Sequence, residues 1–380
     1  MRMFPSVDGD ARLVPLAVLR DWLDRNPEPS DRTGALELLA RSFDGAGFGL
    51  ETEDVEPGPR SVNTSAGLPN APNQEAGVLV PEYEVPDALL VPHYGITSID
   101  LLEHIATAAA EHVGVILLSP DPEATRKFIA TQPDPARFSH LIAASDTAWI
   151  HDRAPVAVRR ADGRITWHLP RWPGDERRAD AALFESISVH PMEPTLLHLA
   201  RGNLIAGPGG LALSTRQLLA ENAQPSATPL REGARQLGIR RWIVFTPFTH
   251  ELTHHADVHV RFLSETLAAV AWNRSLARDR TLAEDLERQL RDAVPGLRVL
   301  RIPIRSQTSR YASLLNWIQL GTALLIPHFK LTPEEDLLET RELLEALGFK
   351  LQFIESPTLE SGGSLHCLTA PVYLSPNGEG

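Results

Sequence analysis

From residue 77 onward, short apolar runs alternate with longer stretches of helical periodicity, and no other feature restricts the fold as strongly. The apolar runs include VGVILLSP, HLIAAS, WIVFTP and ALLIPHF, and the helical stretches fall at 98–112, 215–222, 264–292 and 333–347. Strands that alternate with helices are typical of α/β proteins, in which helices connect neighbouring strands. We therefore expect an α/β fold for residues 76–380.

The first 75 residues have a different character. Two helical patterns, at 13–23 and 33–43, are followed by EPGPRSVNTSAGLPNAPNQEAG, a stretch rich in proline, glycine, asparagine and serine that is typical of a loop. We therefore expect residues 1–75 to form an N-terminal extension, partly helical and loop-rich, and residues 76–380 to form the main domain.

Composition narrows the class of partner. A formal net charge of −13 argues against a nucleic-acid partner, because nucleic-acid phosphates would be repelled. The chain contains no uninterrupted apolar run long enough to cross a bilayer, and its first residues lack the apolar centre of a secretory signal. These features predict a soluble, cytoplasmic protein without a membrane partner. The oligomeric state is open, a homodimer being compatible with the sequence.

The stretch HELTHHADVH at 250–259 raises the question of a metal site. His250, Glu251 and His254 match the HExxH pattern, in which two histidines one helical turn apart bind zinc and the glutamate acts as general base. The pattern requires a helix, because residues i and i+4 must share a face. The β-rich run WIVFTPF lies immediately upstream and is broken by Pro247, which leaves little room for such a helix.

The residues after this pattern favour a strand instead. From His255 to Phe262, polar and apolar residues alternate strictly, which is the periodicity of a β-strand. His255, Asp257 and His259 would then project from one face, which is either a solvated edge or part of a site. We therefore expect a strand here and no metal.

The single cysteine, Cys367, lies in SGGSLHC at 361–367, where two glycines allow the backbone to pass close to a ligand. One cysteine excludes an intrachain disulfide. By itself this thiol is better explained as buried packing than as a nucleophile. The segment resembles the GGGxIHC signature that carries the nucleophilic cysteine of agmatine deiminases and Porphyromonas-type peptidyl-arginine deiminases.

Other motifs of the same family recur in the family's order. PEYE at 81–84 resembles PEWE, DTAWIHDRAP at 146–155 resembles DDxWxRDxGP, and ARGN at 200–203 stands where EGGN is expected. Further along, THHADVHVRF at 253–262 resembles TxGHxDxxxRF, and SLLNW at 313–317 resembles SYxNFY. The resemblance covers about residues 80–375 and leaves the N-terminal extension unexplained.

This resemblance implies the pentein fold, an α/β-propeller of five ββαβ modules around a central channel that holds the active site. It also implies that Cys367 attacks the guanidinium carbon, that His255 transfers protons, and that Asp152 and Asp257 hold the guanidinium nitrogens. Trp149, Asn316, Asp146 and Arg201 are the expected substrate-binding residues. No cofactor or metal is expected.

The chemistry of a guanidinium group fits these residue types. Carboxylates bind its fixed fork of N–H donors bidentately, and its resonance-stabilised carbon requires a nucleophile as strong as a thiolate. The predicted function is therefore a cysteine-dependent hydrolase of C–N bonds that converts a guanidino group to a ureido group and ammonia through a covalent thiouronium. The substrate would be agmatine, arginine or peptidyl-arginine. The alternatives are an amidinotransferase of the same superfamily and a non-catalytic guanidine-binding protein.

Several positions depart from the family pattern. The acid of EGGN is replaced by Ala200 and the next glycine by Arg201, while the arginine of WxRD is replaced by His151. Loss of the acid at 200 removes a partner for a substrate amine, and Arg201 could supply one for a carboxylate. These departures therefore make plain agmatine a doubtful substrate and favour arginine-like or peptidyl substrates.

Overall fold

The computed structural model describes residues 77–94, 98–143, 147–171, 178–187, 192–222, 228–249, 251–307, 310–358 and 363–373. All described residues belong to one compact unit, which lies within Asn63–Gly380. The predicted extension over residues 1–75 and the predicted site residue Asp146 lie outside the described part.

Four segments of the chain repeat one plan, in which two antiparallel strands are followed, after a helix, by a third strand parallel to the second. A parallel pair requires such a crossover, because a tight turn can join only antiparallel neighbours. The first of these modules contains β5 (Val156–Arg159), β6 (Ile165–Arg171), α6 (Arg178–Ile187) and β7 (Met192–His198). The second contains β8 (Ile205–Ala206), β9 (Leu211–Thr215), α7 (Gln217–Glu221), α8 (Thr228–Gln236) and β10 (Arg241–Phe245).

The third and fourth modules follow directly. The third contains β11 (Val260–Ser264), β12 (Leu267–Asn273), α9 (Ala277–Ala293) and β13 (Arg298–Ile304), and a short hairpin follows, β14 (Ser306–Gln307) and β15 (Arg310–Tyr311). The fourth contains β16 (Ile318–Leu320), β17 (Ala323–His328), α10 (Glu334–Glu345) and β18 (Lys350–Glu355). The middle strands β12 and β17 are almost wholly buried, as expected for strands covered on both faces.

The fifth module is assembled from both ends of the described chain. Strand β19 (Ala370–Val372) pairs antiparallel with β2 (Ala88–Pro92), with Ala370 opposite Leu90. Strand β2 continues through α3 (Ile99–Ala110) to the parallel strand β3 (Gly114–Ser119), and α4 (Pro122–Ala130) leads to β4 (Phe138–Ile142). The pairing holds the segment that carries Cys367 against the first strands of the domain.

Local signals in the sequence explain where the helices of this module begin. The Ser98 side chain accepts a hydrogen bond from the backbone N–H of Leu101 at the start of α3. Asp121 accepts hydrogen bonds from Glu123 N and Ala124 N at 2.9 and 3.1 Å, and Pro122 occupies the first turn of α4. Both are standard N-cap arrangements, which satisfy donors that a helix leaves free.

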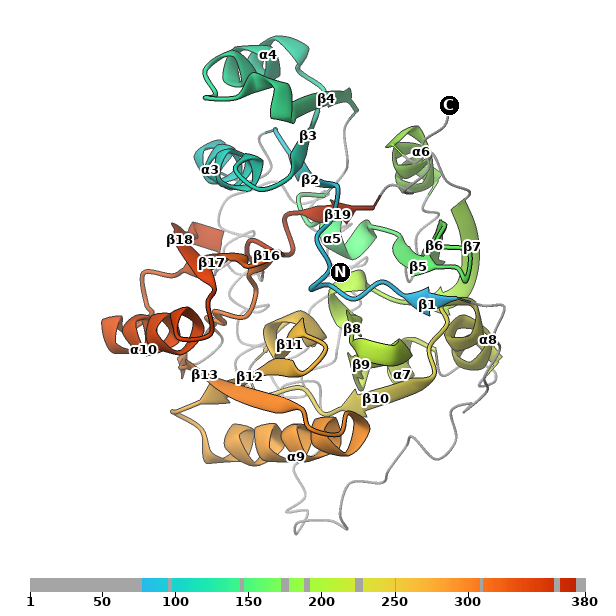
Figure 1. Ribbon diagram of the computed structural model, residues 1–380, viewed down its shortest axis with the longest axis vertical. Helices are drawn as coiled ribbons and strands as arrows, with labels where there is room; N and C mark the ends of the chain where they lie inside the picture. The colour runs from blue at the N-terminus through green and yellow to red at the C-terminus, as the bar shows by residue number, and fades with distance from the viewer. Residues whose placement is uncertain are drawn as a thin grey trace, which may run out of the picture. The chain divides into compact units, whose positions relative to one another are not determined.

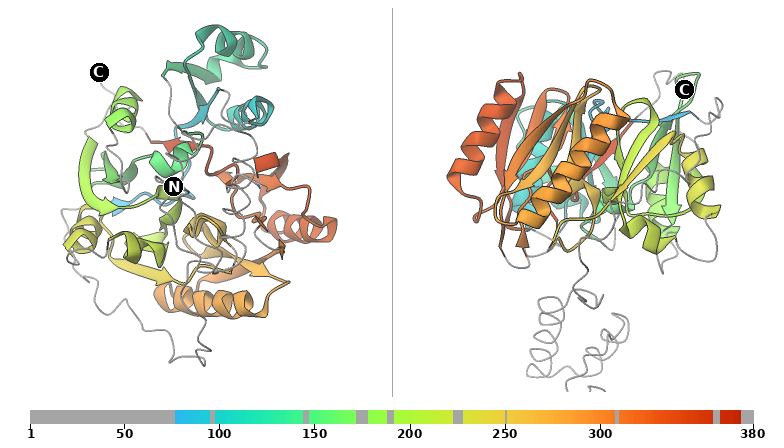
Figure 2. Two further views of the ribbon diagram at one scale, coloured as in Figure 1. Left: turned by 180° about the vertical axis from the view of Figure 1, so that it is seen from behind. Right: turned by 90° about the horizontal axis from the view of Figure 1, so that it is seen from below.

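Figure 1 shows the sheets of the five modules arranged around a common centre, with α6, α8, α9 and α10 towards the outside, whereas α3 lies beside its own sheet and contacts β17 and β18 of the fourth module. The two additional views in Figure 2 show the same arrangement. Short helical turns lie towards the centre, namely α5 (Ile150–Arg153), η3 (Arg201–Asn203) and η5 (Ala256–Val258), and η3 contacts both others. The five ββαβ modules confirm the predicted α/β architecture of pentein type.

The predicted helices at 98–112, 215–222 and 333–347 correspond to α3, α7 and α10. The predicted helix over 264–292 was wrong in its first half, where Ser264 ends β11 and β12 occupies Leu267–Asn273. The run LAAVAW is compatible with either periodicity, and its central position between β11 and β13 decides for a strand. Within the described residues, no helix combines the length and the apolar character that crossing a membrane requires.

Candidate active site

Three predicted catalytic side chains meet at one backbone position, Gly202 in η3. A Cβ atom there would lie 2.7 Å from Oδ1 of Asp152, 2.9 Å from Nδ1 of His255 and 3.4 Å from Oδ2 of Asp257. The first two distances are shorter than real Cβ contacts, so only glycine fits without displacement of its neighbours. Gly202 also donates its N–H to Asp152 at 3.1 Å. The sequence motif ARGN named this residue but did not reveal why glycine is needed.

The fourth side chain, Cys367, joins the group through Asp257. Oδ2 of Asp257 lies 3.5 Å from Sγ of Cys367, 2.9 Å from Nδ2 of Asn316 and 2.9 Å from Nδ1 of His366. Asn316 also donates to Sγ at 3.3 Å. One carboxylate oxygen of Asp257 is therefore held by protein groups on several sides.

Several polar atoms in this group have no hydrogen-bond partner among the described residues. They are Oδ1 of Asp257, Nδ1 of His255 and Oδ1 of Asn316, all buried. Nδ1 of His255 nevertheless lies 3.3 Å from Oδ1 of Asp152 and so forms an ion pair without hydrogen-bond geometry. Buried carboxylate and amide oxygens without partners are costly, and a ligand that supplies N–H donors would satisfy them.

Burial and charge shift the pKa values of these groups in different directions. Burial by itself would lower the pKa of His255, but the adjacent carboxylate of Asp152 and the charge of Asp257 together raise it to about 9. Burial raises the pKa of Asp257 to about 7. Burial and the nearby negative charges of Asp257 and Asp152 raise the pKa of the Cys367 thiol well above its ordinary value. The imidazole is therefore charged and the thiol neutral at pH 7.

The predicted strand through residues 255–259 was wrong. Residues 256–258 form the 3₁₀ turn η5, His259 follows in a turn, and strand β11 begins only at Val260. His255, Asp257 and His259 are all buried, because the segment is enclosed by protein on every side rather than lying at a sheet edge. Strict alternation therefore does not distinguish a strand from an irregular buried segment here.

The HExxH segment is not helical between Glu251 and His255. His254 has a positive φ of 54°, unusual for a residue other than glycine, and His250 lies outside the described residues. Glu251 instead supports the loop: its Oε1 accepts hydrogen bonds from N and Oγ1 of Thr253, and Thr253 Oγ1 accepts one from the N–H of His255. The glutamate thus has a structural role in positioning His255.

The Cys367 loop is fixed by residues from other modules. The backbone N–H of His151 donates to the Cys367 carbonyl at 3.1 Å, and Nδ1 of the same histidine bonds the Thr369 carbonyl at 3.0 Å. The His366 N–H donates to the carbonyl of Asn316. Gly363 lies so close to Trp149 that a Cβ would be 2.6 Å from its ring. His151, a departure from the family motif, therefore holds the loop in place.

The predicted substrate-binding residues differ in which groups of the site they lie near. Trp149 is half-buried at the start of α5, beside Gly363, and Asn316 is buried against Asp257 and Cys367. Arg201 is buried, and apart from burial the groups that shift its pKa are Glu82, Tyr373 and Arg261 rather than Asp152 or Asp257. A substrate role for these residues stays a prediction.

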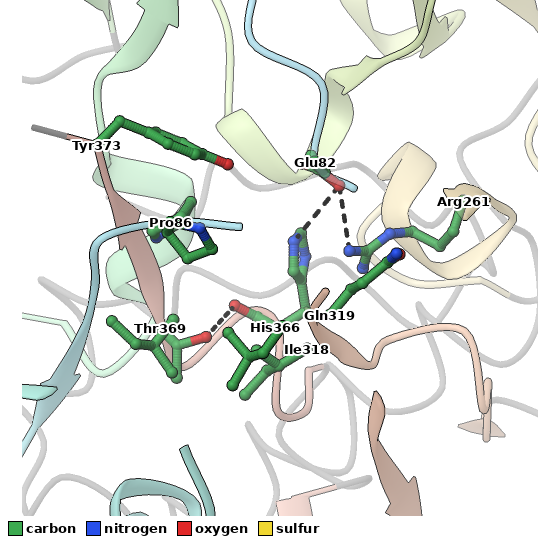
Figure 3. Close-up of a pocket in the computed structure, with 11 residues that line it drawn as sticks. Glu82, Pro86, Arg261, Ile318, Gln319, His366, Thr369 and Tyr373 are labelled. Atoms are coloured by element: carbon green, nitrogen blue, oxygen red, sulfur yellow. Dashed lines mark hydrogen bonds and ion pairs between the residues drawn. The ribbon is translucent and has the colours of Figure 1, made fainter. Parts of the chain in front are cut away.

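A second buried cluster lies on the other side of His366. Oε2 of Glu82 is 3.7 Å from Nε2 of His366 and 3.2 Å from Nη2 of Arg261, as Figure 3 shows, and Oε1 is 4.0 Å from Nε2 of His151. Atoms of Glu82, His151 and His366 that could bind a metal lie within 4.8 Å of one another. The guanidinium of Arg261 already supplies the cation beside Glu82, so charge opposes a divalent metal here, and we assign none.

Sequence reasoning did not single out several residues that the structure brings to this region. Glu82 and His366 were quoted only as parts of motifs, although a polar residue next to the lone cysteine was an available signal. Glu221 is another, because burial raises its pKa while the charge of His255 lowers it, and its Oε2 is buried without a partner among the described residues.

Solved structures share this fold. Agmatine deiminase of C. jejuni is 18 % identical, with 79 % of this chain and 96 % of that chain covered and a TM-score of 0.66. Agmatine deiminase of Enterococcus faecalis is 14 % identical, with 78 % and 96 % covered and a TM-score of 0.66. Comparison with curated proteins gave no match. The fold is thus that of the pentein-type deiminases.

The comparison with family models identifies the chain more narrowly than the shared fold does. The model of the Porphyromonas-type peptidyl-arginine deiminase family matches residues 97–372, and the chain belongs to this family. It is accordingly a hydrolase that acts on C–N bonds of guanidino groups. The matched residues include all four predicted catalytic residues, Asp152, His255, Asp257 and Cys367.

Proposed function

We propose that the protein is a cysteine-dependent guanidine deiminase, in which Asp152 and Asp257 bind the guanidinium, Cys367 attacks it and His255 transfers protons. The convergence of these four side chains beside Gly202 and Asn316 supports the proposal most directly. The family match supports the reaction class independently of that geometry.

The binding step follows from the unpaired acceptors. A guanidinium offers N–H donors in a plane, and Oδ1 of Asp257 is buried without a partner among the described residues. Asp152 also lies beside Gly202 and is already oriented by the Gly202 N–H. A cation between two acids also offsets the cost of their burial, since each negative charge gains a partner.

The cation also activates the thiol. In the free protein, burial and the negative charges beside Cys367 raise the pKa of its thiol, which disfavours the thiolate. A bound guanidinium reverses that local charge, so the thiolate forms when substrate is present. Attack on the guanidinium carbon then gives a tetrahedral adduct that is covalently attached to sulfur.

His255 would act twice. Its pKa of about 9 means that it is protonated at pH 7 and can donate a proton to the departing ammonia. The remaining thiouronium is attacked by water, whose proton passes to the now neutral imidazole. Carbon–sulfur cleavage then releases a ureido product and returns Cys367, so the net reaction is guanidine plus water to urea plus ammonia.

The substrate class is a guanidine of the agmatine, arginine or peptidyl-arginine type. A cysteine-to-serine variant of C. jejuni agmatine deiminase, 17 % identical with 79 % of this chain and 97 % of that chain covered and a TM-score of 0.66, has been solved with substrate bound. In this chain, Ala200 and the buried Arg201 stand where the family motif has Glu and Gly, which favours substrates whose tail is not a simple amine.

Incubation of the full chain with agmatine, free arginine and arginyl peptides tests the proposal. We expect release of ammonia without an acceptor amine and a ureido product of matching mass from at least one substrate. The Cys367→Ser variant should bind the same substrate and release no ammonia. Absence of ammonia from every substrate, or unchanged turnover by Cys367→Ser, would disprove the proposed function. An absolute need for an acceptor amine would identify an amidinotransferase instead.

A further inference from the structure

The starting observation is that, among the described residues, His255 is not a hydrogen-bond partner of the Cys367 thiol. The side-chain hydrogen-bond partners of Cys367 Sγ within the described residues are Asn316 Nδ2 at 3.3 Å and Asp257 Oδ2 at 3.5 Å. Asn316 can only donate from that nitrogen. His255 is also already protonated at pH 7, since its pKa is raised to about 9. Asp257 is thus the acceptor that the thiol faces.

A protonated Asp257 would lack the negative charge that binds the guanidinium cation. The proton taken from the thiol must therefore move on to another group. The same Oδ2 atom lies 2.9 Å from Nδ1 of His366, and the opposite ring nitrogen of His366, Nε2, faces Oε2 of Glu82 at 3.7 Å. A neutral imidazole can accept a proton at one nitrogen while it releases another from the second. Asp257, His366 and Glu82 therefore form a line that leads away from Cys367.

Glu82 is suited to the end of this line. Both of its carboxylate oxygens are buried and lack a hydrogen-bond partner among the described residues, although Arg261 forms an ion pair with one of them. Glu82 and His366 also line a cavity of about 20 Å³, shared with Gln319, Thr369 and Tyr373 (Figure 3). That volume is sufficient for one water molecule, which would hydrogen-bond to a protonated Glu82.

We propose that, when a guanidinium binds, the thiol proton of Cys367 leaves through Asp257 and His366 to Glu82, on the side opposite the substrate. The S–H bond breaks and Asp257 Oδ2 takes the proton. Asp257 passes a proton to Nδ1 of His366, whose Nε2 proton moves to Glu82. The result is a thiolate, a charged Asp257, a neutral His366 in its other tautomer and a protonated Glu82. This inference rests on the proposed function and deepens it, with Glu82 and His366 as positioning residues.

The groups around His366 keep its imidazole neutral before and after the proton transfer. Burial and the positive charge of Arg261 lower the pKa of His366 well below its ordinary value, so an imidazolium would not accumulate. The 3.7 Å step to Glu82 is longer than a hydrogen bond, as such contacts often are before substrate binds. The titratable or charged groups that face the His366 ring come from several elements, and they are Asp257, Glu82, His151, Arg201 and Arg261.

The first test uses Glu82→Gln, which preserves side-chain size but cannot take the proton. The full chain is alkylated with chloroacetamidine, a cationic amidine that traps thiolate, from about pH 6 to about pH 9. We expect alkylation of Glu82→Gln to be slower than that of the wild type by about tenfold or more near pH 7. Tyr373→Phe, which removes a hydroxyl from the same cavity, should react within about twofold of the wild type. Equal rates for wild type and Glu82→Gln would overturn the proposal.

The second test separates proton transfer from a structural effect of the substitution. The tautomer of His366 is followed by NMR of isotopically labelled histidine rings in the wild-type chain, before and after alkylation by chloroacetamidine. The signal is assigned by its loss in His366→Gln or, if that variant does not fold, by its shift in Glu82→Gln. We expect Nε2–H before alkylation and Nδ1–H afterwards. A single tautomer throughout would refute the relay.

These readouts do not depend on turnover. If chloroacetamidine alkylates Cys367 but no guanidine releases ammonia, the proposed function fails while the relay is still decided by the variant rates and the tautomer. If the wild-type thiol resists the cationic reagent at every pH, the relay itself is refuted, because it requires that a bound cation generate thiolate.

Discussion

Oδ2 of Asp257 lies 3.5 Å from Sγ of Cys367 and receives a hydrogen bond from Asn316, whereas Oδ1 of the same carboxylate is buried without a partner among the described residues. One oxygen is therefore committed to the protein and the other is available to a ligand. Burial of the unpaired oxygen lowers the stability of the protein when no ligand is bound.

Replacing Asp257 by Asn should reduce activity and increase stability. The variant loses charge-assisted hydrogen bonds to the guanidinium, each worth about 1.5–3 kcal/mol, so kcat/KM should fall by roughly 100-fold or more. The folded-state pKa of Asp257 is raised to about 7, so its contribution to stability is present at low pH and is lost as pH rises through about 7. Thermal unfolding should therefore show a higher Tm for Asp257→Asn at about pH 8 than for the wild type, with a smaller difference at about pH 5. A lower Tm for the variant at both pH values would contradict this account.

The pH dependence of kcat/KM should be bell-shaped. Activity requires charged Asp257 and protonated His255, so the rate should rise through the pKa of about 7 and decline through the pKa of about 9. For stability, the raised pKa of His255 gives a contribution that is complete below its unfolded value and lost as pH rises through about 9. Initial-rate measurements of ammonia release across this range provide the check, and activity that keeps rising above about pH 10 would rule out protonated His255 as the acid.

Gly202→Ala should disturb catalysis more than folding. Its Cβ would lie 2.7 Å from Asp152 Oδ1 and 2.9 Å from His255 Nδ1, so these two groups must move apart. We expect a loss of about tenfold or more in kcat, because displacement of catalytic groups by a fraction of an ångström is sufficient for such losses. Gly163→Ala is the matched control, since that glycine has a φ of 85° with nothing within 4 Å. The control should cost about 1 kcal/mol in unfolding free energy and leave kcat unchanged.

Removal of metal should have no effect on fold or activity. The segment between Glu251 and His255 is not helical, and Glu251 is engaged with Thr253 and with His259 at 3.7 Å. Dialysis against a strong chelator should leave both Tm and ammonia release unchanged, and stoichiometric zinc in the purified protein would contradict the expectation.

Glu251→Ala should instead destabilise the fold by about 3–5 kcal/mol in urea unfolding, because it breaks a buried pair.

His151 and Arg201 should be energetically coupled. Both depart from the family motif, which has arginine at the first position and glycine at the second. Burial and then the positive charge of Arg201 lower the pKa of His151. His151→Arg should destabilise the protein by placing another buried cation beside Arg201, and adding Arg201→Gly should recover part of that loss. A double-mutant cycle in urea should give a coupling of about 1 kcal/mol or more, and simple additivity would show that the two departures are unrelated.

The sequence was sufficient for the α/β fold class and for the family. The alternation of apolar runs and helical stretches predicted α/β, and α3, α7 and α10 lie at their expected positions. These features depend on local periodicity and on motifs, which are properties of neighbouring residues. The same local reasoning failed at residues 256–258, where a strand was predicted and a 3₁₀ turn is found.

Only the tertiary structure determined which residues lie close to Cys367. The pairing of β19 with β2 brings residue 370 beside residue 90, and Asp257, His366 and Glu82 approach one another from segments far apart in the chain. Periodicity describes which face of an element is apolar, but it carries no information on the packing of one module against another. The charges that raise the pKa of His255 and protect the Cys367 thiol from ionisation therefore arise only once the modules have packed, because both effects require burial and close approach.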